Sequence, residues 1–92
     1  MATIHMDVES CNSTATAIGN AKSSMEEQMN TLSSTVSNTV GSAWIAPSAN
    51  EFQNAYQEWS SAMKQLMEQL ASLQQRLTAE IAEFEQAASK LS

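Results

Sequence analysis

The sequence predicts an all-α fold, an antiparallel hairpin of two long helices, from three observations. Its 92 residues include only two glycines and one proline, too few for a sheet whose strands are joined by tight turns. The one turn-like cluster, residues 41–48, lies near the middle of the chain. On both sides of this cluster, apolar or small residues recur with a period of about 3.5, which is typical of helices packed along their length.

The first helix is expected over about residues 7–41. Asp7 is a suitable N-cap, because its carboxylate can accept from a free backbone N–H, and Gly41 is a suitable C-cap residue. Lys22 interrupts the apolar stripe of this segment, and we expect its stem to pack while its amine reaches toward Glu26. The other members of the stripe are Val8, Cys11, Ala15, Ile18, Met25, Met29, Leu32, Val36 and Val40.

The turn is expected over about residues 42–47 and the second helix over about 48–90. Pro47 as the first helical residue, and Ser48 as an N-cap in a capping box with Glu51, are alternative starts for this helix. At a rise of 1.5 Å per residue the two helices would be roughly 50 and 65 Å long, so the predicted shape is a rod. The apolar stripe of the second helix comprises Phe52, Tyr56, Trp59, Met63, Leu66, Leu70, Leu73, Leu77, Ile81, Phe84, Ala88 and Leu91.

The two stripes match when the hairpin turns near position 46. Val36 then faces Tyr56, and the small Ala15 faces the larger Leu77, a complementarity of size that favours packing. All 92 residues form one domain, since two separate cores would not fit. The positions expected to pack within the hairpin or between two hairpins include Val36, Val40, Phe52, Tyr56, Trp59, Met63, Leu66 and Leu70.

A single hairpin leaves much of each helix exposed to water, because each helix has one neighbour. Apolar residues also lie beyond the predicted seam, among them Ile45 and Met67. The first helix is rich in Ser, Thr and Asn, which are weak helix formers that need tertiary support. We therefore expect two hairpins to pair into a four-helix bundle.

Composition and charge argue against several other classes of protein. The net charge is −6 and the pI is about 4.4, which argues against binding to nucleic acid or to an anionic membrane surface. No apolar stretch is long enough to span a membrane. The start, MATIHMDVES, lacks the basic and apolar regions of a cleaved secretory signal.

The residues needed for catalysis or metal binding are scarce. Cys11 is the only cysteine and His5 the only histidine, so no intrachain disulfide, no zinc or haem site and no His-dependent catalytic constellation is expected. A rod has no cleft that excludes water from a carboxylate. We predict a protein that is not an enzyme, binds no cofactor and carries Cys11 as an inert thiol in the seam.

The predicted turn contains the tripeptide Trp44-Ile45-Ala46, and an aromatic run follows it at Phe52, Tyr56 and Trp59. Together with the chain length, the two long helices and the missing signal peptide, these residues resemble the WXG (Trp-Xaa-Gly, ESAT-like) family of helical hairpins of ~100 residues. The resemblance covers essentially the whole chain. It implies a substrate or co-secretion partner of a bacterial type VII secretion system. In this chain Ala46 stands where the family has glycine.

The resemblance also implies roles for both ends of the hairpin. Trp44, next to Ala46, would be part of a docking surface for the secretion ATPase, besides closing the end of the bundle over Val40 and Phe52. The family's export signal is a tyrosine followed four residues later by an acid, and Phe84 and Ala88 occupy these places here. Phe84 is also expected to face Val8 and close the hairpin.

The resemblance implies a protein that is made in the bacterial cytoplasm and secreted without a cleaved signal peptide. It would act as a homodimer, or as a heterodimer with a related hairpin. The antiparallel pairing of the family places one chain's tail beside the other chain's turn, so a partner could supply the missing tyrosine and acid. Two alternatives stay open: a structural or adaptor hairpin, and a chaperone-like targeting partner of a larger effector.

Overall fold

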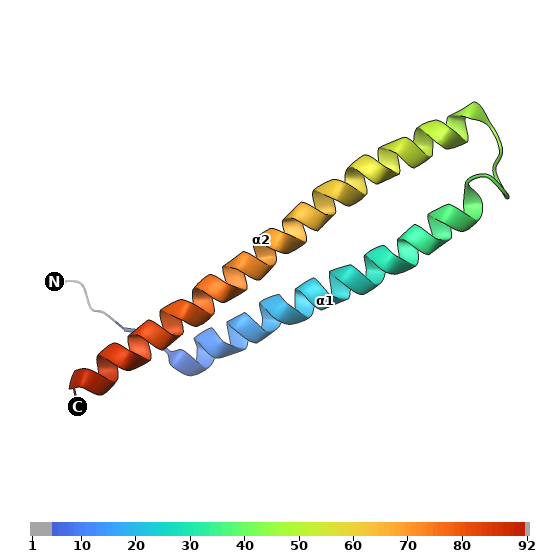
Figure 1. Ribbon diagram of the computed structural model, residues 1–92. Helices are drawn as coiled ribbons and strands as arrows, with labels where there is room; N and C mark the ends of the chain where they lie inside the picture. Colours follow the sequence, from blue (N-terminus) through green and yellow to red (C-terminus); the bar gives the residue numbers. More distant parts are fainter. Residues whose placement is uncertain (1–4, 92) are drawn as a thin grey trace.

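The computed structural model describes residues 5–91 as two antiparallel helices, α1 (Val8–Thr39) and α2 (Pro47–Leu91). Residues 1–4 and 92 and the side chain of Leu91 lie outside this description. In Figure 1 the helices lie side by side, with the start of α1 and the end of α2 at the same end of the molecule. The prediction of an all-α helical hairpin is confirmed.

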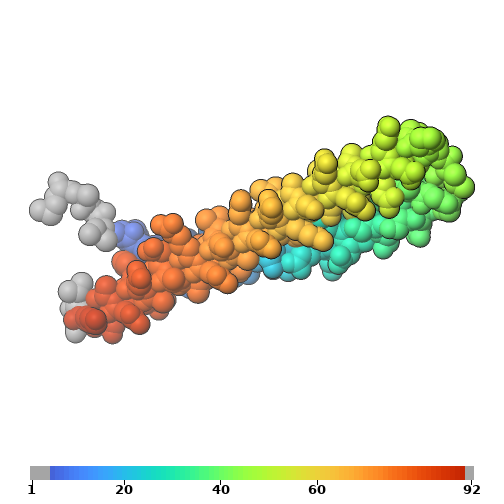
Figure 2. Space-filling model, turned by 45° about the horizontal axis from the view of Figure 1, so that its top comes forward, coloured from blue at the N-terminus to red at the C-terminus, as the bar shows by residue number. Residues whose placement is uncertain are grey.

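The molecule is a rod, as the space-filling view shows (Figure 2). Its principal extents are 69 × 21 × 17 Å and its radius of gyration is 20.8 Å, against about 12 Å for a compact chain of this length. Its accessible surface is 7036 Å², whereas a compact protein of the same mass exposes roughly 5,200 Å². The hairpin therefore leaves an unusually large share of its surface in water.

The end of each helix follows from local capping. Asp7 is the N-cap of α1 as predicted, and its Oδ1 accepts from the Ser10 backbone N–H at 3.1 Å; this hydrogen bond lowers the pKa of Asp7. At the other end α1 stops at Thr39 because Val40 has extended backbone angles. Helix α2 begins at Pro47, so of the two predicted alternatives Pro47 takes the first helical position.

Two hydrogen bonds between the helices define their register. The hydroxyl groups of Ser33 and Tyr56 lie 2.8 Å apart, and Gln74 Nε2 donates to the Ala15 carbonyl at 2.9 Å. Tyr56 was expected opposite Val36, one helical turn from Ser33. Leu77, expected opposite Ala15, likewise lies about one turn from Gln74. The observed register therefore differs from the predicted one by about one helical turn.

The seam between the helices is thin. Among the described residues six hydrophobic ones are buried, and of these only the small Ala49, 1% exposed, is almost completely shielded from water. Met67 was expected outside the seam, and this expectation is wrong, since only 8% of Met67 is exposed. The buried residues are Ala15, Met29, Val36, Ala49, Met67 and Ile81.

Gly19 leaves room for the side chain of Gln74. A Cβ at position 19 would lie 2.6 Å from Gln74 Nε2, so Gly19→Ala is expected to push the amide away and break its bond to Ala15. The lost bond costs about 0.5–1.5 kcal/mol, and alanine in a helix returns roughly 0.5–1 kcal/mol. We expect little net change in the free energy of unfolding of Gly19→Ala.

The coupling between the two positions is measured by a double-mutant cycle in urea. In a Gln74→Ala background, Gly19→Ala should stabilise the protein by about 0.5–1 kcal/mol, because only the gain in helix propensity remains. Additive effects of the two substitutions would show that Gly19 and Gln74 do not interact.

Candidate functional site

The loop between the helices is closed by its own backbone. The Gly41 N–H donates to the Trp44 carbonyl at 3.0 Å, and the Trp44 N–H donates to the Thr39 carbonyl at 2.9 Å. Gly41 has φ +90°, a left-handed conformation that glycine adopts without a steric penalty. The loop geometry thus depends on Gly41 and on main-chain bonds. These bonds fix the backbone of Trp44 independently of its side chain.

Ala46 requires no left-handed backbone. Among residues 5–91 no residue other than glycine has a positive φ. The Ala46 carbonyl accepts from the Ala49 N–H at 3.0 Å just before α2 starts at Pro47. An alanine where the resemblance leads one to expect glycine is therefore accommodated without backbone strain.

Trp44 packs against the start of α2 but keeps an exposed edge. Its ring centroid lies 5.8 Å from that of Phe52, with an interplanar angle of 49°, within the range of favourable aromatic pairs. Trp44 is 37% exposed and its neighbour Ile45 is 79% exposed. Two large apolar side chains at the tip of a rod form a surface that another protein can contact.

A second exposed surface runs along α2. Four large apolar residues at intervals of seven are each about half exposed, and we call them the apolar row: Phe52, Trp59, Leu66 and Leu73. Seven residues are nearly two helical turns, so the four side chains follow one line along the helix, drifting by about 20° per interval. Trp59 is also in ring contact with Tyr56, at 5.7 Å between centroids. Several large apolar side chains exposed on one face of a helix are typical of protein–protein interaction sites.

The predicted packing positions divide between the seam and this row. Val36 is buried, and Val40, Tyr56, Met63 and Leu70 are half-buried. Phe52, Trp59 and Leu66 belong to the apolar row. The sequence stripe did not separate the residues that face α1 from those that stay exposed. Positions 56, 63, 70 and 77 are apolar at the same spacing as the row, so the spacing does not tell which of the two lines faces α1.

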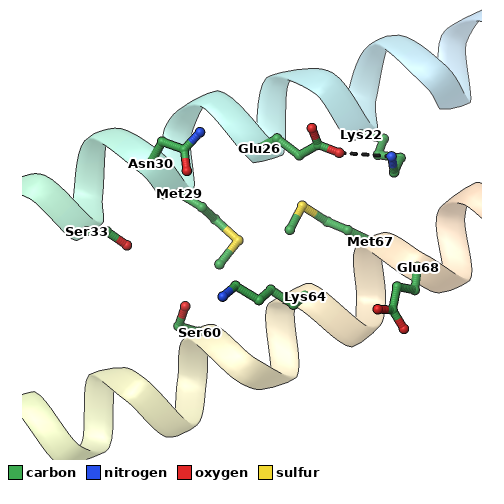
Figure 3. Close-up of a pocket in the computed structure, with 9 residues that line it drawn as sticks. All are labelled: Lys22, Glu26, Met29, Asn30, Ser33, Ser60, Lys64, Met67 and Glu68. Carbon is green, nitrogen blue, oxygen red and sulfur yellow. Dashed lines mark ion pairs between the residues drawn. The ribbon is translucent and has the colours of Figure 1, made fainter.

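The opposite flank of the seam is polar. There a hollow of about 400 Å³ lies between the helices, and Figure 3 shows the sulfur atoms of Met29 and Met67 at its floor. Lys22 Nζ pairs with Glu26 Oε1 at 2.9 Å, as predicted. The remaining lining residues are Asn30, Ser33, Ser60, Lys64 and Glu68.

The two flanks are distinct because of helix geometry. Lys64, in the hollow, and Leu66, in the apolar row, are two positions apart and so lie about 200° apart around α2, with Met63 and Met67 between them. On α1, Leu32 is 40% exposed and lies two positions from Asn30 in the hollow. Leu32 therefore lies on the same flank as the apolar row. The hairpin has one apolar and one polar flank.

The C-terminal part of α2 holds the other predicted site. Phe84 is half-buried and Ala88 is exposed. Helix α2 runs past the start of α1, as Figure 1 shows, so its last turn has no helix beside it. This segment is accessible to another protein.

The described residues provide little for chemistry. Within residues 5–91 no group of three His, Cys, Asp or Glu side chains could hold a metal ion. Cys11 is a half-buried free thiol, less enclosed than predicted, and His5 is exposed. None of the described helices combines the length and the apolar character needed to cross a lipid bilayer.

Comparison with known protein families identifies the hairpin. Residues 3–89 match the family described as "Proteins of 100 residues with WXG". The chain belongs to the WXG100 family. Members of WXG100 are associated with the substrates of type VII secretion and typically pair with each other. No curated protein and no solved structure shows a significant match to the chain.

Proposed function

We propose that this WXG100 protein is a substrate or co-secretion partner of a type VII secretion system and acts by protein–protein recognition as a pair of hairpins. The observation that carries the proposal is the uncovered apolar row of α2, which one hairpin alone leaves in water. Family membership supports the link to secretion. The function is binding, and it needs no catalytic group.

In this proposal the two ends of the rod have separate tasks. The Trp44 turn, with Ala46 behind it, docks on the secretion ATPase. The C-terminal end of α2, around Phe84 and Ala88, lies beside the turn of the partner hairpin and completes the recognition surface. The chain is made in the bacterial cytoplasm and leaves without a cleaved signal peptide.

A secretion assay tests this function. The chain is expressed in a bacterium that has a type VII system, with either an active or an inactivated secretion ATPase, and is measured in the medium and in the cells. We expect weak but ATPase-dependent export, because Phe84 and Ala88 lack the hydroxyl and the carboxylate of the family's signal.

An absence of ATPase-dependent export, also when related hairpins are co-expressed, would contradict the proposal. Retention in the cell within a larger stable complex would favour the adaptor alternative. Export only together with a larger effector would favour the targeting alternative.

A further inference from the structure

Four of the six methionines lie in the middle part of the rod. Met25 and Met29 are four residues apart on α1, and Met63 and Met67 are four residues apart on α2, so each pair lies on one face of its helix. Met29 and Met67 are buried, and Met25 and Met63 are half-buried. Each helix therefore brings two thioether sulfur atoms to the seam.

The register of the hairpin brings the two pairs to the same height along the rod. In the register that the two interhelical hydrogen bonds define, position 64 is level with Met25 and position 22 is level with Met67, so the pairs overlap. Side chains of a helix lean toward its N-terminus. Because the helices are antiparallel, Met29 and Met67 lean toward each other, and in Figure 3 both point into the hollow.

The hollow gives these sulfur atoms access to solvent. A methionine that serves only to fill a core adapts its shape and closes the space beside it, whereas here a hollow of about 400 Å³ borders the two buried methionines. Two lysines and two glutamates line this hollow, so their formal charges cancel, and the whole chain has a net charge of −6. A small cation that enters the hollow thus meets no net positive charge.

We infer that the hollow is a binding site for a soft monovalent metal ion, copper(I), held by the thioether sulfur atoms of Met29 and Met67. Met25 and Met63, one helical turn before them, supply further sulfur ligands. Thioethers are soft and uncharged, so they select copper(I), whereas magnesium and calcium prefer oxygen ligands. A methionine site of this kind needs no histidine, thiolate or carboxylate ligand. The inference goes beyond the proposed function and does not rest on it.

Silver(I) is the probe for this site, because it has the charge and softness of copper(I) and is not oxidised in air. It is added in a chloride-free buffer to a Cys11→Ser chain, in which the free thiol of Cys11 no longer competes. We expect native mass spectrometry to show one silver ion per chain. The methyl NMR signals of Met29 and Met67 should shift on binding, and copper(I) under reducing conditions should displace the silver.

A pair of conservative substitutions tests the ligands. Met29→Leu combined with Met67→Leu keeps the apolar volume of the seam, which cores tolerate well, but removes both sulfur atoms from the hollow. We expect this variant to stay helical by circular dichroism and to lose silver binding. Met6→Leu is the matched control, because Met6 precedes α1 and does not line the hollow, and it should bind silver like the parent chain.

The pH dependence of binding identifies the type of ligand. A thioether does not titrate, so silver binding should be equal at about pH 7.5 and pH 5.5, whereas a site that uses His5 would lose its ion as the imidazole is protonated. A loss of binding at the lower pH would overturn the inference. So would a folded parent chain that binds no silver, or equal silver binding by the parent and the double leucine variant.

The outcomes also separate this inference from the proposed function. The hollow lies on the polar flank, away from the apolar row, so pairing along the row leaves it open. A chain that binds silver through its methionines but is never exported would leave the metal site standing and remove the function. A chain that is exported with the ATPase but binds no silver would remove the metal site alone.

Discussion

Trp44→Ala is expected to reduce ATPase-dependent export to background while the hairpin stays folded. The loop is held by the main-chain bonds among Thr39, Gly41 and Trp44, which the substitution leaves intact. The indole packs on Phe52 and is 37% exposed, so its removal should cost about 1–2 kcal/mol, below the ~3–5 kcal/mol of a fully buried aromatic. The expected effect on docking is much larger, because aromatic anchors carry most of the binding energy at protein interfaces.

The measurement combines export with thermal unfolding. Trp44→Phe keeps an aromatic ring against Phe52 and should retain part of the export, and Ile45→Ala removes a neighbouring side chain that is 79% exposed. If Trp44→Ala exports normally, docking does not use this residue. If it loses its helicity, Trp44 is mainly a structural cap of the hairpin.

The hairpin could be predicted because the spacing of the apolar residues alone indicates two long helices. Which of these residues face the other helix was harder to predict. Positions 56, 63, 70 and 77 of α2 belong to the predicted stripe and are half-buried in the structure, and with them the seam uses Ala49 and Met67. The members of the stripe at 52, 59, 66 and 73 are left about half exposed. The apolar band is wider than the seam, and periodicity alone does not tell which of its residues face α1 and which stay exposed.

The turn shows a similar division between what the sequence could and could not predict. The sequence located the break, and Gly41 was expected near the end of the first helix, where the structure gives it a left-handed backbone. Whether Ala46 could replace the family's glycine depends on the φ angle at that position, which a single sequence does not contain. The hollow of the polar flank was also missed, because Ser33, Ser60 and Lys64 come together only through the pairing of the two helices.

Restoring the family pattern by Phe84→Tyr with Ala88→Asp is expected to increase export of the chain several-fold. Phe84 is half-buried and Ala88 exposed, so the new hydroxyl can extend from the ring toward solvent and the new carboxylate stays hydrated. In the function proposed above, the C-terminal end of α2 lies beside the turn of the partner hairpin. The restored tyrosine and acid would thus stand beside the turn of the partner.

The stability of this double variant should change little. An acid in the last turns of a helix interacts unfavourably with the helix dipole and destabilises the helix by roughly 0.3–1 kcal/mol. In a protein of this size such a loss lowers the melting temperature by a few degrees. Phe84→Tyr alone and Ala88→Lys are the controls, since each lacks the complete pair. Export of the double variant at the level of the unmodified chain would show that the recognition signal lies elsewhere on the hairpin.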